Sequence, residues 1–247
     1  MAYIWPKVLP ADVKPFFGAE WMTGNIIEGH GPLCAAYENK NGAFNGEGDT
    51  PAFLHAIPNG LRSLESPSYG GWGGRYEPAA GGYGHPDGQW GFANSWSKMM
   101  EHWAYPDLVA VRTAYFKPIW RWLKDVQNDF AARADWCVKG YAEANHHPVV
   151  SLVDTPADIC ARPGEALTLD ATASADPDGD RRAFRWWHYA EAGTYRGQEI
   201  SGGCVPKVGV VVPSDAKPGD TIHFVCTVTD DGTPALTRYA RVVVTVR

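Results

Sequence analysis

Residues 221–246 read TIHFVCTVTDDGTPALTRYARVVVTV, two apolar segments separated by a run of turn residues. Both segments are rich in β-branched and aromatic side chains, whereas Asp, Gly, Thr and Pro fill the stretch between them. This composition predicts two β-strands, over 221–230 and 236–246, joined by a turn. Further segments of the same kind precede this pair, so the surrounding chain is also expected to form β-strands.

Four shorter strand-like segments, each bounded by turn residues, lie at 149–154, 166–170, 183–189 and 208–212. Six or seven short strands within about a hundred residues predict an all-β antiparallel sandwich of the immunoglobulin type. Segment 183–189 reads AFRWWHY, and strand alternation places its two tryptophans on opposite faces. We expect Trp186 to lie in the core beside Phe184.

Near residue 147 the sequence changes from helical and glycine-rich segments to short strand-like segments, which divides the chain into 1–147 and 148–247. Residues 50–61 predict a short helix, with Thr50 as N-cap and Pro51 at the first helical position. A longer helix is expected within 116–145, because apolar side chains recur at steps of three and four from Ile119 to Tyr141. Asp125, Asp129 and Asp135 lie off that stripe, and we expect them to be solvated.

Residues 66–96, between the two predicted helices, show no periodicity and are rich in glycine and proline. A disordered linker would lack aromatic rings, yet this stretch holds many of them. We therefore expect an ordered loop that presents aromatic side chains, the kind of segment that often carries function. The rings belong to Tyr69, Trp72, Tyr76, Tyr83, Trp90, Phe92 and Trp96.

The overall composition narrows the classes of partner. The formal net charge of -6 over 247 residues argues against nucleic acid or anionic lipid as the main partner. No apolar run approaches membrane-spanning length. The first residues lack the pattern of a signal peptide, so either the chain is cytoplasmic or its true beginning lies elsewhere.

The five cysteines show neither a C-x-x-C pair nor zinc spacing. Their odd number leaves at least one thiol free. Cys160 and Cys226 can face each other on strands of the second part, so a single disulfide and two buried free thiols both remain open.

Two acidic residues, Glu47 and Asp49, stand among glycines directly before the helix predicted at 50–61. Gly46 and Gly48 allow the backbone to approach a ligand closely. A carboxylate beside backbone carbonyls suits Ca²⁺ or Mg²⁺, but Asp49 can equally serve only to stabilise the helix dipole.

Three further groups have both a chemical and a structural interpretation. His30 lies between glycines and can act as an acid or base near a sugar, or can be a turn histidine bonded to backbone. In GGWGGRYE, residues 70–77, Trp72 can cover the apolar face of a pyranose while Arg75 donates to hydroxyls. The alternative is that Trp72 fills the core beneath a glycine turn.

The third group is SADPDGD, residues 174–180, which can hold Ca²⁺ but is also favourable turn chemistry. We favour the turn. In an immunoglobulin-like topology this loop and the turn at Asp230 and Asp231 share one end of the sandwich. Both are therefore predicted to lie near the junction with residues 1–147.

Several long motifs together resemble one bacterial family. EGHGPLCAAY, GEGDTPAFLHAIPNGL, GGWGGRYE and QNDFAARADWCV follow one another in the first part, and SADPDGDRRAFRWWHYAEAGTYRG and VTDDGTPALTRYARVVVTV lie in the second. They resemble a family of cellulose-binding proteins with a nucleoside-hydrolase-like domain followed by an immunoglobulin-like domain. The resemblance implies that residues 1–147 are the C-terminal part of a doubly wound α/β domain.

The resemblance also implies site residues. Asp49 looks like the late aspartate of the nucleoside-hydrolase calcium site, whereas nothing before Asn45 resembles its early D-x-D-x-x-x-D-D cluster. The rest of the site would then come from a second copy or from a separate N-terminal half. The catalytic candidates are Asp49, His30 and Glu47, the metal candidate is Asp49 with Ca²⁺, and the ligand-binding candidates are Asn25, Trp72, Arg75, Tyr76 and Trp90.

Two functions follow from the resemblance. The first is binding of cellulose or another plant polysaccharide, and the second is Ca²⁺-dependent hydrolysis of N-glycosyl or glycosidic bonds. Members of such a family are expected outside the cytoplasm, in the extracellular space or the periplasm.

Overall fold

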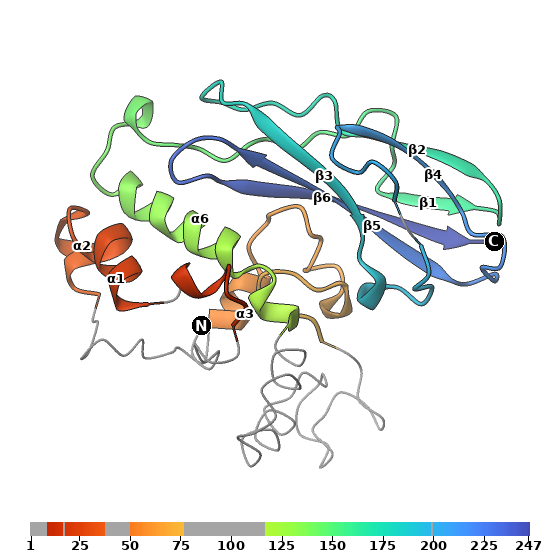
Figure 1. Cartoon of the computed structure of the whole chain (residues 1–247), viewed down its shortest axis with the longest axis horizontal. Helices are drawn as coiled ribbons and strands as arrows, with labels where there is room; N and C mark the ends of the chain where they lie inside the picture. The colour runs from red at the N-terminus through yellow and green to blue at the C-terminus, as the bar shows by residue number, and fades with distance from the viewer. Residues whose placement is uncertain (1–8, 17, 38–49, 77–116, 199) are drawn as a thin grey trace, which may run out of the picture. The chain divides into compact units, whose positions relative to one another are not determined.

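The chain forms two compact units in a computed structural model that describes residues 9–16, 18–37, 50–76, 117–198 and 200–247, without the side chains of 50–52. One unit holds residues 1–57 and 63–140, and the other holds 58–62 and 141–247. The second unit thus takes a short segment from the first part of the chain. Figure 1 shows the helices in the first unit and the strands in the second.

The described part of the first unit is helical. Its longer elements are α1 (Ala19–Met22), the π-helical η3 (Thr23–Ile27), α2 (Gly31–Ala35), α3 (Thr50–His55) and α6 (Leu123–Trp136). Two short 3-10 turns, η2 (Lys14–Phe16) and η5 (Pro67–Tyr69), accompany them. Within the described residues this unit contains helices and no strand, so a doubly wound sheet stays a prediction here.

Helix α6 carries much of the core of the first unit. Ala131 and Ala134 pack with Met22, Ile26 and Cys34 from α1, η3 and α2. The predicted apolar stripe is correct where it lies inside the helix, since Leu123 and Val126 are buried. The helix ends at Trp136, however, so the later members of the stripe, Cys137, Val138 and Tyr141, are exposed.

The expectation of solvated aspartates on α6 was wrong for two of the three. Asp129 is 3% exposed and Asp135 is 8% exposed. Each carboxylate has a cationic partner one turn later, with Arg133 Nε 2.7 Å from Asp129 and Lys139 Nζ 2.9 Å from Asp135. The helix is covered on more than its apolar stripe, so the acids are enclosed and paired.

The second unit contains two β-sheets. One has the strand order β1 (Asp158–Ala161), β6 (Thr237–Val246), β5 (Thr221–Asp230) and β3 (Arg182–His188), and the other pairs β2 (Ala166–Asp170) with β4 (Lys207–Val211). β1 runs parallel to β6, whereas the remaining pairs are antiparallel. Two 3-10 turns, η6 (Tyr141–Glu143) and η7 (Ala190–Ala192), lie outside the sheets.

The strand predictions agree closely with these bounds, with two differences. β2 and β5 begin and end where the sequence predicted, β6 begins one residue later, and β3 and β4 are each shifted by one residue toward the N-terminus. Residues 149–154 make one isolated bridge, Val149 to Ala175, instead of a strand. β1 was not predicted, because only four residues pair there.

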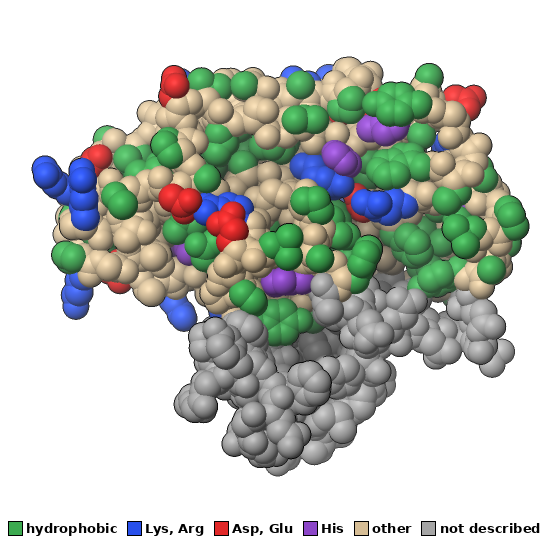
Figure 2. Space-filling view, turned by 180° about the vertical axis from the view of Figure 1, so that it is seen from behind, with side chains coloured by type: hydrophobic (Ala, Val, Ile, Leu, Met, Phe, Trp, Pro, Cys, Tyr) green, Lys and Arg blue, Asp and Glu red, His purple; other side chains and the backbone are tan. Residues whose placement is uncertain are grey.

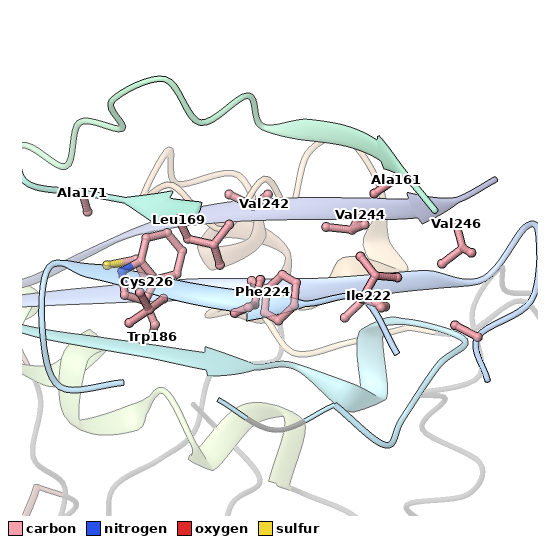
Figure 3. Packing of buried hydrophobic residues seen from close by; sticks show 14 of the residues in the cluster. Ala161, Leu169, Ala171, Trp186, Ile222, Phe224, Cys226, Val242, Val244 and Val246 are labelled. Atoms are coloured by element: carbon pink, nitrogen blue, oxygen red, sulfur yellow. The ribbon is translucent and has the colours of Figure 1, made fainter. Parts of the chain in front are cut away.

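The two sheets share one apolar core, shown in Figure 3. Trp186 is 2% exposed within it, and its indole Nε1 donates to the carbonyl of Pro206 at 3.0 Å. Phe184 packs against the same cluster. The predicted inward tryptophan is therefore confirmed. Trp187 points to the other face of β3, where its indole donates to Thr227 Oγ1 at 3.0 Å.

The segment 58–62 hydrogen-bonds to the backbone of β6 near the start of that strand. The Tyr239 amide donates to the carbonyl of Asn59 at 2.9 Å. Gly60 has a φ of 93°, and a Cβ added there would collide with the Tyr239 carbonyl. Arg62 donates to both Asp158 carboxylate oxygens, at 3.0 and 2.8 Å. Only glycine fits at position 60.

All five cysteines are free thiols in this structure. Cys226 is completely buried in the core of the second unit, and burial raises the pKa of its thiol to about 12. Cys160 is exposed. The disulfide between them that the sequence left open is not formed.

Candidate functional site

Three of the predicted site residues, Glu47, Asp49 and Trp90, lie outside the described residues. The calcium site expected at Asp49 therefore stays a prediction. The other candidates fall into two groups, one on the loop that follows α3 and one on the helices that pack on α6.

The loop that carries Trp72 is a tight turn closed by glycines. Gly71 and Gly74 exchange two backbone hydrogen bonds of 3.0 and 2.8 Å, and Gly70 and Gly74 have φ angles of 75° and 99°. Trp72 is only 1% exposed. Of the two interpretations of Trp72, the structure supports the one in which the ring fills the core beneath a glycine turn, because the turn folds the indole inward. Stacking on a sugar would require the ring to be uncovered.

Tyr76 and His55 meet beside this turn. The Tyr76 hydroxyl donates to the Gly73 carbonyl at 3.1 Å, and its ring stands edge-on to His55 with centroids 5.7 Å apart. Burial raises the pKa of Tyr76, and burial lowers the pKa of His55 against an opposing backbone hydrogen bond at Ser63. Both rings are therefore uncharged at neutral pH. Arg75, the next candidate, is half-buried.

Phe53 is the ring that sequence reasoning missed. It lies on α3 two residues before His55, and it is 68% exposed. Adjacent helical residues cannot share one face, and its neighbour Leu54 is 6% exposed. That pairing was the available signal, since one of the two side chains had to point outward. Leu64 is also exposed, at 69%.

His30 joins α2 to α6. Its Nε2 lies 3.2 Å from Asp135 Oδ1, and that oxygen also contacts Lys139 Nζ at 2.9 Å. The alternative of a turn histidine bonded to backbone is thus replaced by a histidine–carboxylate pair. His30 Nδ1 is enclosed and has no hydrogen-bond partner in the described part of the chain. An imidazole oriented by a carboxylate can transfer protons through its other nitrogen.

Asn25 serves its own helix. Its Nδ2 donates to the Trp21 carbonyl one turn earlier, at 2.9 Å. The contacts of His30 and Asn25 are with the helices around α6, whereas those of Tyr76 are with α3 and the glycine turn.

Replacing Asp135 with alanine is expected to destabilise the first unit by about 2 kcal/mol, because His30 and Lys139 lose their shared acceptor beside a buried helix. Denaturation followed by helical circular dichroism measures the loss. Asp12→Ala, at an exposed position, is the control and is expected to stay within about 0.5 kcal/mol of the parent. Equal curves for the two variants would contradict a bridging role for Asp135.

The acidic loop of the second unit is organised by its own hydrogen bonds. Asp176 Oδ1 accepts from the amides of Asp178 and Asp180 at 2.9 and 3.1 Å. Asp178 accepts from the His146 amide at 2.6 Å. This is the turn that the sequence favoured.

The carboxylates of that loop also converge. One oxygen each from Asp176, Asp178 and Asp180 lie within 4.8 Å of one another, the only group of three acidic, His or Cys side chains placed like this among the residues that the structure describes. Burial, followed by the charge of Asp176, raises the pKa of Asp180. Oxygen donors of this type are those that Ca²⁺ prefers.

The Asp176–Asp180 loop and the turn at Asp230 both contact residues 145–146, close to the boundary predicted at residue 147. His146 bonds to Asp178, and the Asn145 side-chain amide donates to Asp230 Oδ1 at 3.2 Å. Asn145 and His146 themselves belong to the second unit, so the prediction that these loops lie near the junction with the first part of the chain stays a prediction. Figure 2 shows acidic and basic side chains interspersed among hydrophobic ones on the face that it presents.

The comparisons with known proteins agree with the resemblance seen in the motifs. Residues 7–76 match the family model described as cellulose-binding Sde182, nucleoside hydrolase-like domain. Residues 166–246 match the model described as cellulose-binding protein Sde0182, C-terminal domain. Both models describe cellulose-binding Sde0182 proteins. The Sde0182 matches keep the order of the two domains, and no curated protein matches the chain.

A solved structure is similar over nearly the whole chain. It is a nucleoside hydrolase-related hypothetical protein from Saccharophagus degradans that is associated with carbohydrate metabolism, with 34% identity and a TM-score of 0.73. The match covers 98% of this chain and 56% of that chain, so this chain spans about half the length of its relative. Mouse clustered PcdhgC3 EC1-3 matches 41% of this chain and 33% of that chain at 17% identity and a TM-score of 0.23, too low to inform the fold.

Proposed function

We propose that this chain is a carbohydrate-associated protein that binds cellulose or a related plant polysaccharide. The observation that carries the proposal is the pair of Sde0182 family matches, one in each unit and in family order. The association of the Saccharophagus relative with carbohydrate metabolism supports the same class of ligand.

The described surface offers a binding chemistry for a neutral polysaccharide. A pyranose ring has apolar faces that stack on aromatic rings, and its hydroxyls take hydrogen bonds. Phe53 presents such a ring, and Tyr76 and His55 belong to the same unit as uncharged polar groups. Arg75 adds guanidinium donors for hydroxyls. In the proposed site Phe53 stacks on the glycan, and the buried Trp72 supports the glycine turn.

Phe53→Ala is expected to weaken binding to insoluble cellulose about five- to tenfold, because an exposed stacking ring contributes on the order of 1 kcal/mol. A depletion assay with increasing cellulose measures the affinity. Leu33→Ala is the matched control, since Leu33 is 75% exposed but lies on α2. Unchanged binding by Phe53→Ala would exclude Phe53 from the site, and no binding by the parent chain would exclude cellulose as the ligand.

Several finer features belong to the same proposal. The second unit is proposed to be an immunoglobulin-like sandwich, which its shared core and strand pairing support. No helix in the described part of the chain is long and apolar enough to cross a membrane. The proposed polysaccharide ligand supports a site of action in the extracellular space or the periplasm.

A partner interface is also proposed, with a second copy or with a separate N-terminal half. The relative is longer than this chain, which is consistent with further chain beside it. Ca²⁺-dependent hydrolysis is not carried forward, since its main residues, Glu47 and Asp49, lie outside the described residues. Binding is therefore the function that the described residues support best.

A further inference from the structure

Two cysteines from distant parts of the sequence lie on helices that contact each other in the first unit. Cys34 is on α2, and Cys137 directly follows the last residue of α6. Their helices touch at this point. His30 Nε2 lies 3.2 Å from Asp135 Oδ1, and a Cβ placed on Gly31 would lie 3.1 Å from Val138 Cγ1.

The two thiols differ in exposure. Cys34 is 8% exposed and packs in the cluster that includes Ala131 and Ala134 of α6. Cys137 is exposed, and its Sγ lies 3.3 Å from the Arg133 carbonyl. Burial raises the pKa of Cys34, and the charge of Cys137 and a hydrogen bond between the two side chains raise it further. Cys34 packs in the same cluster as Ala134, which lies one turn before Cys137, so the two thiols lie at the same contact between α2 and the end of α6.

We propose that Cys34 and Cys137 form a disulfide bond when the protein meets an oxidising disulfide. The proposal rests on this geometry and is independent of the ligand.

The chemistry is thiol–disulfide exchange in two steps. The exposed Cys137 loses its proton, and its thiolate attacks one sulfur of the oxidant, forming a mixed disulfide and releasing one oxidant thiolate. Cys34 then loses its proton and attacks the Cys137 sulfur, which forms the internal S–S bond and releases the second oxidant thiolate. The protein gives up two electrons and two protons, and the oxidant becomes two thiols.

Other fates of these thiols are less well supported by the contacts. A zinc site would need at least a third ligand, but the group of three acidic, His or Cys side chains that converges among the described residues is the Asp176 loop. Cys226 is buried in the core of the second unit, and Cys160 and Cys204 are exposed on that unit.

The cross-link would join α2 covalently to the end of α6. It closes a chain segment from residue 34 to residue 137, a long loop. Long closed loops lose much conformational freedom in the unfolded state, so the oxidised protein should melt at a higher temperature than the reduced one.

The test oxidises the full chain with oxidised glutathione, blocks free thiols with an alkylating agent under denaturing conditions, and digests it with trypsin. We expect mass spectrometry to find peptides 8–40 and 134–139 joined, with a mass two hydrogens below their sum. The melting temperature should fall when reductant is added. Alkylation of both cysteines after oxidation, or a glutathione adduct that persists on Cys137, would overturn the proposal.

Three variants separate the cross-link from general effects. Cys34→Ser and Cys137→Ser should each lose the joined peptides and the dependence of the melting temperature on reductant. Cys204→Ser, at an exposed thiol of the other unit, should keep both. If Cys137→Ser keeps the reductant-dependent shift, or if the joined peptide contains Cys204, the proposed pairing is wrong.

Discussion

Replacing Trp186 with alanine is expected to lower the free energy of unfolding of the second unit by about 3–5 kcal/mol. The indole is one of the largest fully buried side chains of the chain, and it sits between the two sheets with Leu169, Phe224 and Cys226 around it (Figure 3). Its removal leaves a cavity that a sandwich core cannot close, and the Pro206 carbonyl loses its donor. Urea denaturation followed by near-ultraviolet circular dichroism measures the loss.

Trp187→Ala provides the matched control, because the two tryptophans are neighbours on one strand and differ only in the face they occupy. Trp187 is half-buried and touches Tyr189 at 5.2 Å between ring centroids. We expect less than half of the loss seen for Trp186→Ala. If Trp186→Ala fails to fold, Trp186→Phe gives the same ranking with a smaller cavity. Equal losses at both positions would show that the shared core is not where the stability lies.

Below about pH 6.5 the second unit is expected to lose stability through His223. Its side chain is 2% exposed, and burial, followed by the positive charge of Arg241, lowers the pKa of His223 to about 3. Arg241 Nη1 donates to His223 Nδ1 at 3.1 Å, which requires that nitrogen to carry no proton. Between pH 6.5 and about 3, His223 is therefore neutral in the folded state but protonated in the unfolded state.

The direction and size of this pH effect on the free energy of unfolding follow from proton linkage. Because the pKa of His223 is lower in the folded state, its contribution to stability is complete above pH 6.5 and is lost as the pH falls toward 3. The difference amounts to on the order of 4 kcal/mol. Urea unfolding at several pH values measures it. His223→Gln cannot titrate and should flatten the curve between pH 6.5 and 4, so an unchanged slope would contradict this role.

Asp170 adds a second acid-labile group at lower pH. A hydrogen bond from Lys207, with others from Thr172, lowers the pKa of Asp170 to about 2. Its contribution is complete above about pH 4 and disappears as the pH falls toward 2. The two groups act in adjoining pH ranges, so the His223 measurement is best read above pH 4.

The strands were predictable because local patterns carry most of their information. The alternation in AFRWWHY and the β-branched run at 242–246 needed no distant partner to be recognised. β1 escaped notice because its four residues, DICA, are held in place by pairing with β6 more than eighty residues later. Local patterning gave no hint of that partner.

The site residues were harder to predict for the same reason. His30 and Asp135 are 105 residues apart, so a histidine that locally looks like a turn residue is in fact one half of a bridge. Trp72 could be read from the sequence either as a stacking ring or as a core ring, and the fold of the glycine turn, which buries it, is what decides between the two. The exposure of Phe53 could have been predicted locally. Two adjacent helical side chains cannot both be buried on one face, so either Phe53 or Leu54 had to point outward.

The contacts of residues 58–62 bear on how this protein can be divided. The Tyr239 amide, near the start of β6 in the four-stranded sheet, donates to the Asn59 carbonyl, and Arg62 pairs with Asp158 on the edge strand β1. A fragment that starts at residue 141 would lack both partners, although it contains every strand. The β-sheet unit is thus discontinuous in the sequence. To express it separately, residues 58–62 would have to be joined to residues 141–247.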